Sequence, residues 1–185
     1  MFEQDYTFYG KHARYVTRLT SALKGLDSTG IFQRNLDVYK IASVIGMTYG
    51  RQAEIDKSLE ENSLNDKVDI KKIAGTQMNT ISSELQYIYE LVMLNHRKKE
   101  DDIELRIDRA FRYTSNEKMK KEGEKIFNSY VLGGVEVLYE KIFKDDTDTD
   151  DILANLYEFI DEFNDRYGEN REDTDIYEMV RTLKD

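Results

Sequence analysis

Apolar residues return at steps of three and four positions along most of the chain, which is the spacing of one face of an α-helix. Over residues 11–26 this repeat places four leucine and valine side chains on one face, namely Val16, Leu19, Leu23 and Leu26. The same spacing predicts further amphipathic helices over about 76–96, 100–113, 117–143, 152–167 and 176–183.

The segment over about 35–55 has a different pattern, because it is apolar on nearly all sides. Only a narrow polar strip remains, formed by Asp37, Lys40 and Ser43. A helix that is apolar all round is normally buried. We therefore expect this segment to be a central helix with its isoleucines and valines away from solvent.

Three polar stretches separate the helical segments, at about 27–30, 60–72 and 145–151. The second contains the string VDIKKI, which is compatible with a short extended piece. The chain has no proline, so nothing in it forbids long helices. The sequence thus predicts an all-α fold, an irregular bundle of six or seven helices around the central helix, in a single domain over residues 1–185.

The charge is unevenly distributed. The chain has a net charge of -10, and residues 144–185 hold fifteen acidic and five basic residues, so this acidic C-terminal third accounts for the whole net charge. No stretch approaches the roughly 18 consecutive apolar residues that a membrane span needs. The first residues also lack the layout of a signal peptide. We expect a cytoplasmic protein with no membrane partner.

Motifs for catalysis are missing from the sequence. Cysteine is absent, which excludes thiolate nucleophiles and cysteine-based zinc sites. Phosphate-loop, dinucleotide-binding, nucleophile-elbow and zinc-protease motifs are also absent. The two histidines, His12 and His96, lack the ExxH spacing of di-iron bundles. The sequence predicts that the protein is not an enzyme, with no catalytic residue, no metal site and no cofactor.

One acidic run, Asp146–Asp151, resembles the start of an EF-hand loop in its alternating oxygen ligands. The resemblance ends at the sixth position, which is Asp151 instead of glycine, and at the twelfth, which is Tyr157 instead of glutamate. We expect the run to cap the following helix instead, with Asp150 or Thr149 accepting its free backbone N–H groups.

Basic residues follow helical spacing in two places, as the sets Lys11, Arg14, Arg18 and Arg106, Arg109, Arg112. Such sets are candidates for contacts with nucleic-acid phosphates or with a partner. A second interpretation is a solvated helix face, in which Asp102, Glu104 and Asp108 pair with the second set. A third is that these residues dock onto the acidic third, within one molecule or between copies.

A candidate acidic face lies on the helix after residue 151. It comprises Glu158, Asp161, Glu162, Asp165 and Glu169. This face is either an ordinary solvated surface or an imitation of nucleic-acid phosphates.

Two further features concern packing. The aromatic residues Tyr6, Phe8 and Tyr9 precede the first helix, and we expect them to pack onto the domain or onto another protein.

Glycines occur at positions 46 and 50 of the central helix and as the pair at 133–134. Because glycine has no side chain, we expect two backbones to come close at these positions, and the pair could also kink its helix.

The missing motifs lead to a preferred function. We expect a non-catalytic helical interaction protein that is a small accessory subunit of a larger bacterial or phage assembly, with defence-related assemblies among the candidates. Its partner would be another protein or a second copy of the chain. The first alternative is a nucleic-acid-associated protein that binds the phosphate backbone through the two basic sets. The second is an acidic inhibitor that imitates nucleic acid.

Overall fold

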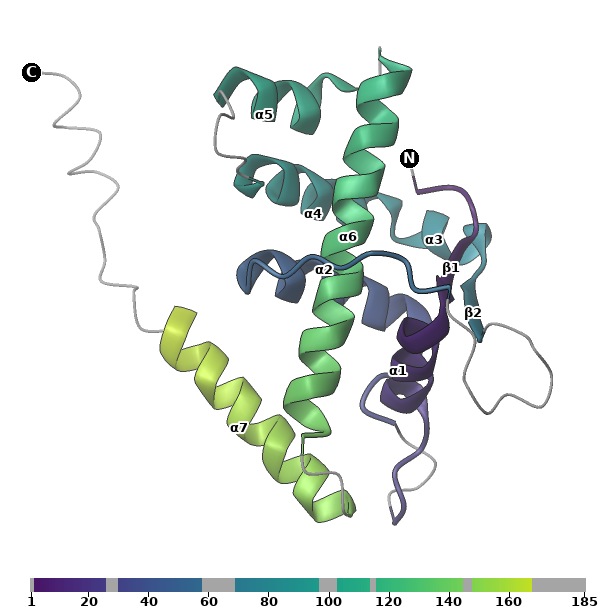
Figure 1. Cartoon of the computed structure of the whole chain (residues 1–185), viewed down its shortest axis with the longest axis vertical. Coiled ribbons are helices and arrows are strands. Elements are labelled where there is room, and N and C mark those ends of the chain that lie inside the picture. The colour runs from purple at the N-terminus through teal and green to yellow at the C-terminus, as the bar shows by residue number, and fades with distance from the viewer. Residues whose placement is uncertain are drawn as a thin grey trace, which may run out of the picture. The chain divides into compact units, whose positions relative to one another are not determined.

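The structure is a computed structural model that describes residues 2–25, 30–57, 69–96, 103–113, 116–144 and 148–167. These residues form mainly helices, with one two-stranded sheet, so the predicted all-α bundle of six or seven helices is confirmed (Figure 1). The chain divides into two compact units, residues 1–140 and 141–185, which are described separately. The predicted helix at 176–183 lies outside the described residues.

Unit 1 contains a small antiparallel sheet of β1 (Tyr6–Tyr9) and β2 (Ile70–Ile73). Tyr6 is opposite Ile73 and Tyr9 is opposite Ile70. The last four residues of the string VDIKKI therefore form a short extended piece, as predicted, whereas β1 was not predicted. β1 forms because Phe8 is fully buried and Tyr6 stacks edge-on against Tyr39, so the expectation that these rings pack onto the domain is confirmed.

Helix α1 (Gly10–Thr20) follows β1 directly and ends six residues earlier than predicted. The Thr20 and Ser21 hydroxyls donate hydrogen bonds back to the carbonyls of Val16 and Thr17, at 2.9 and 2.6 Å. Such local bonds compete with continuation of a helix. Leu23, which the helical pattern included, is buried although it lies outside the helix.

Helix α2 (Asn35–Thr48) is the predicted central helix and ends earlier than 55. Gly50, with φ of +63°, turns the chain out of the helix. The residues after it run extended across α6 (Glu117–Ile142), where the Ala53 amide donates to the Ser129 carbonyl at 2.9 Å (Figure 1). Within α2, Ile45 is buried, but Ile41 is 39% exposed, so the helix has one open side.

Glycines bring the backbones of α2 and α6 together. A Cβ on Gly46 would lie 2.0 Å from the Tyr130 carbonyl oxygen, and a Cβ on Gly134 would lie 1.8 Å from that of Ala42. Gly133 similarly faces the Arg51 carbonyl at 2.1 Å. The expected close approach is confirmed at these three positions, and α6 runs through the glycine pair as one helix.

The helix predicted over 76–96 is divided into α3 (Gly75–Thr80) and α4 (Ser82–Asn95). The division falls at Ile81, whose φ of -121° and ψ of 21° are not helical. Helix α5 (Ile103–Phe111) packs against α4, and the Tyr89 hydroxyl donates to the Arg109 carbonyl at 3.1 Å.

Unit 2 contains the last residues of α6 and helix α7 (Thr149–Tyr167). The Asp148 carboxylate accepts the Asp151 backbone N–H at 3.0 Å, so the residue that caps the helix is Asp148. The expectation that Asp150 or Thr149 would do so is therefore wrong. These two residues lie inside the first turn, where their side chains are past the capping position.

Candidate functional site

A nearly buried carboxylate lies at the centre of a charged cluster in unit 1. Glu136 on α6 has a side chain that is 7% exposed. Its Oε1 accepts from Lys11 Nζ at 2.8 Å and lies 3.2 Å from His12 Nε2. Its Oε2 accepts from Arg51 at 3.0 and 3.2 Å. A second carboxylate, Asp56, accepts the Lys11 backbone N–H at 2.9 Å and so caps the start of α1.

Burial and charge act in opposite directions on the pKa values of this cluster. Burial raises the pKa of Glu136, but the hydrogen bonds from Lys11 and Arg51 outweigh it and hold this pKa below its ordinary value. The hydrogen bond to Glu136 raises the pKa of Lys11. Burial lowers the pKa of His12 despite the neighbouring carboxylate. The imidazole is therefore neutral at pH 7, with its Nε2 donating to Glu136.

The geometry gives this cluster a structural role. Both oxygens of Glu136 are occupied by donors, so the carboxylate is not free to accept a proton from a ligand. The donors come from α1 and from the segment after α2, and they tie both to α6. In the part of the chain that is described, no three histidine or acidic residues are arranged to hold a metal ion.

The second histidine is placed in a separate environment. His96 Nδ1 lies 3.2 Å from Gln52 Nε2 and 3.1 Å from the Tyr130 hydroxyl. The two histidines thus have different sets of partners, and each keeps one buried ring nitrogen without a hydrogen bond among the described residues. Neither environment could be predicted from the sequence, because the partners of both histidines lie far away along the chain.

The first basic set is engaged with carboxylates of unit 1. Lys11 pairs with Glu136, and Arg14 pairs with Asp69 at 3.0 Å. Arg18 lies exposed in the last turn of α1. Lys11 and Arg14 therefore bind carboxylates of the fold, and contact of the whole set with nucleic acid or a partner stays a prediction.

The second basic set does not form a single face. Arg106 donates to the Leu94 carbonyl at 2.9 Å, near the end of α4. Arg109 is buried, with 4% of its surface exposed, and lies 3.9 Å from Glu122. Arg112 is exposed and pairs with Asp108 at 2.8 Å and with Glu104 at 3.8 Å, so the predicted local pairing is confirmed for these two carboxylates. Asp102 lies outside the described residues.

The acidic face of α7 is partly occupied by lysines of unit 2. Glu158 pairs with Lys144 and Glu162 pairs with Lys141, each at 2.5 Å. Asp161 and Asp165 are exposed and make no ion pair within the described ranges. Glu169 lies outside the described residues.

A second face of α7 carries exposed apolar side chains, which the sequence pattern did not separate from the buried ones. Leu153, Tyr157 and Ile160 are 38%, 69% and 48% exposed. They follow one another at steps of four and three residues and so lie on one side of the helix. We call this set the α7 apolar face. The buried side of the same helix is formed by Ile152 and Phe159.

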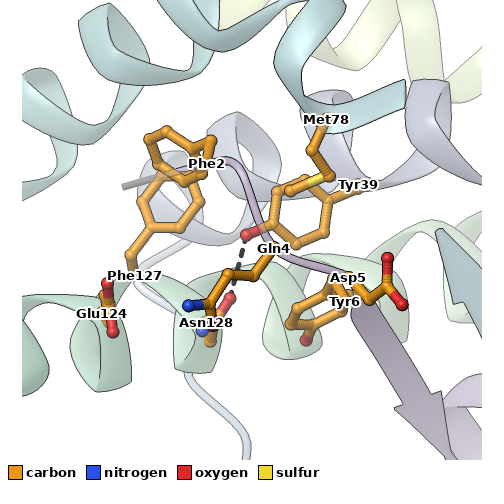
Figure 2. A pocket seen from close by; sticks show the side chains of 9 residues that line it. All are labelled: Phe2, Gln4, Asp5, Tyr6, Tyr39, Met78, Glu124, Phe127 and Asn128. Carbon is orange, nitrogen blue, oxygen red and sulfur yellow. Dashed lines mark hydrogen bonds between the residues drawn. The ribbon is translucent and has the colours of Figure 1, made fainter. Parts of the chain in front are cut away.

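A pocket of about 120 Å³ opens between the N-terminal segment, α2 and α6 of unit 1 (Figure 2). Its walls combine aromatic rings with acidic and amide side chains, contributed by Phe2, Gln4, Asp5, Tyr6, Tyr39, Met78, Glu124, Phe127 and Asn128. The Tyr39 hydroxyl donates to Asn128 Oδ1 at 3.0 Å. Sequence reasoning missed this pocket because its residues come from segments far apart in the chain.

Comparisons with protein-family models, with curated proteins and with solved structures find no match to this chain. Among the described residues, no helix is both long enough and apolar enough to cross a membrane.

Proposed function

We propose that the chain is a non-catalytic interaction protein, an accessory subunit that binds another protein through α7. The observation that supports this most directly is the α7 apolar face, which leaves three large side chains in solvent. Apolar residues grouped in helical register on a surface are typical of interaction sites.

The charge of α7 restricts the chemistry of the partner. Residues 149–167 contain six carboxylates and one arginine. Two of the carboxylates border the α7 apolar face, since Asp150 precedes Leu153 by three residues and Asp161 follows Tyr157 by four. A complementary surface is therefore apolar in its centre and basic at its edge, as in an amphipathic helix rich in lysine and arginine.

The test is site-specific photocrosslinking of the full chain in its native host. A photoreactive amino acid at Tyr157 should crosslink to a partner whose crosslinked segment is a basic amphipathic helix. The variant Leu153→Ser with Ile160→Ser should reduce this crosslink about tenfold or more, because two anchors of the interface are lost.

Matched controls are available on unit 1, where other large apolar side chains are exposed. The same photoreactive residue at Tyr87, which is 64% exposed, should not capture that partner. The substitution Ile70→Ser should leave the crosslink at position 157 unchanged. Equal capture from positions 87 and 157 would contradict the proposal.

A further inference from the structure

The pocket of Figure 2 contains a carboxylate that the fold leaves without a counterion. Glu124 is half-buried on α6, and within the described part of the chain it makes no hydrogen bond or ion pair. The one other carboxylate among the lining residues, Asp5, is neutralised, since it pairs with Lys72 at 2.5 Å and accepts the Gly75 amide at 2.7 Å. A half-buried charge without a partner costs free energy that a bound cation would recover.

Amide groups beside Glu124 add further acceptors. Asn128 lies one helical turn after Glu124, so both side chains are on the same face of α6. Its Oδ1 already accepts the Tyr39 hydroxyl, which fixes the orientation of the amide toward the pocket (Figure 2). Gln4 faces the same space from the N-terminal segment.

The remaining walls are suited to an organic cation. The rings of Phe2, Tyr6, Tyr39 and Phe127 line the pocket, and aromatic rings attract cations through their π faces. No lysine, arginine or histidine is among the lining residues, so an anion would meet the negative charge of Glu124 and no basic side chain of the pocket wall. The apolar wall, which includes Met78, favours a cation that carries methyl or methylene groups over a hydrated metal ion.

We propose that this pocket binds an alkylammonium group, with Glu124 as its counterion and the aromatic rings around its methylene groups. A volume of about 120 Å³ accommodates an ammonium head and a few carbon atoms. The group belongs either to a free amine or to the end of a lysine side chain. This site is in unit 1 and is independent of the proposed role of α7.

The experiment is a titration of the full chain followed by amide chemical shifts in NMR spectra. The probes are methylammonium chloride, spermidine and N-acetyl-lysine methylamide, with sodium chloride and sodium acetate at matched ionic strength as references. We expect the amides of Tyr39, Glu124 and Asn128 to shift, with dissociation constants on the order of millimolar. Tighter binding of the lysine derivative assigns the group to a protein side chain, and tighter binding of spermidine assigns it to a free amine.

The variant Glu124→Gln should weaken binding of each amine about tenfold or more, because a charge-assisted hydrogen bond is lost. Glu117→Gln, which makes the same change at an exposed position on the same helix, should leave binding unchanged. The spectra themselves show whether each variant is folded. Equal binding to the wild type and Glu124→Gln, shifts equal to those with sodium chloride, or no shift at tens of millimolar amine would overturn the proposal.

Discussion

Glu136 shows how a charge is accommodated in the core of unit 1. Its carboxylate is nearly buried, yet its pKa stays below the ordinary value because Lys11, His12 and Arg51 surround it. Burial alone would have favoured the protonated form. The charged residues around Glu136 therefore support two predictions, one on the stability of the fold and one on how this stability depends on pH.

Replacing the carboxylate should be strongly destabilising. We expect Glu136→Ala to lower the free energy of unfolding by about 2 kcal/mol, since it leaves the buried His12 Nε2 without its acceptor, whereas the exposed Lys11 and Arg51 can turn to solvent. Urea denaturation followed by circular dichroism measures this change. The neighbouring substitution Glu140→Ala removes one exposed contact with Arg51, so its effect should stay below about 1 kcal/mol. Equal losses for the two variants would argue against the special role of Glu136.

His12 should make stability depend on pH. Burial places its pKa below the ordinary 6.5, so the unfolded chain binds a proton before the folded chain does. The free energy of unfolding should therefore fall as the pH is lowered through 6.5 toward the folded pKa. Urea titrations between pH 5 and 8 on the wild type and on His12→Gln isolate this effect, because the difference between the two should vary with pH only in that window. A constant difference would show that His12 does not contribute to the pH dependence.

Among the elements, the crossing of α2 and α6 depends most strictly on residue size. Gly134→Ala would place a methyl group 1.8 Å from a backbone oxygen, and backbone atoms cannot move aside as a flexible side chain can. We expect a loss of about 3 kcal/mol or more. Thermal and urea denaturation provide the measurement.

Gly50→Ala is the matched control, because nothing lies within 4 Å of its Cβ position and only its φ of +63° opposes the change. This variant should cost about 1 kcal/mol. If Gly134→Ala were no more costly than Gly50→Ala, the helices would not be in contact through their backbones.

The start of α7 depends on one capping side chain. Asp148→Ala removes the acceptor of the Asp151 amide and should destabilise the helix by about 1 kcal/mol. Faster hydrogen exchange of the first-turn amides would report this loss. Asp150→Ala removes a similar charge from the first turn without removing the cap, so a smaller effect is expected.

Several elements could be predicted from the sequence and others could not. Apolar repeats located the helices because burial of one face dominates their stability. The break at Ile81 was missed because the repeat continues through it, and β1 was missed because its four residues are stabilised by Tyr39, far away in sequence. The site was harder still, since the partners of Glu136 and the other residues that line the pocket of Glu124 come from distant segments. The buried position of Arg109 likewise depends on tertiary packing.

For the whole molecule, charge separates the preferred function from the nucleic-acid alternative. A complex centred on the α7 apolar face should weaken only modestly as salt rises, because desolvated apolar contacts are insensitive to screening. Binding to phosphates through Arg14, Arg18 and Arg112 should collapse steeply over the same range. Gel-shift titrations between 50 and 200 mM salt, with these three arginines replaced by alanine as the comparison, measure the second behaviour.

The crossing of α2 and α6 has one more consequence for the molecule. Gly134 lies between Asn128, which lines the pocket, and Glu136, which anchors the buried charges. Backbone contact at that point allows only one register of α6 against α2. A shift of α6 by a single residue along its axis would carry Glu124 away from the aromatic rings of the pocket and Glu136 away from Lys11 at the same time. Gly46 and Gly134, which have no side chain, therefore keep both environments in alignment.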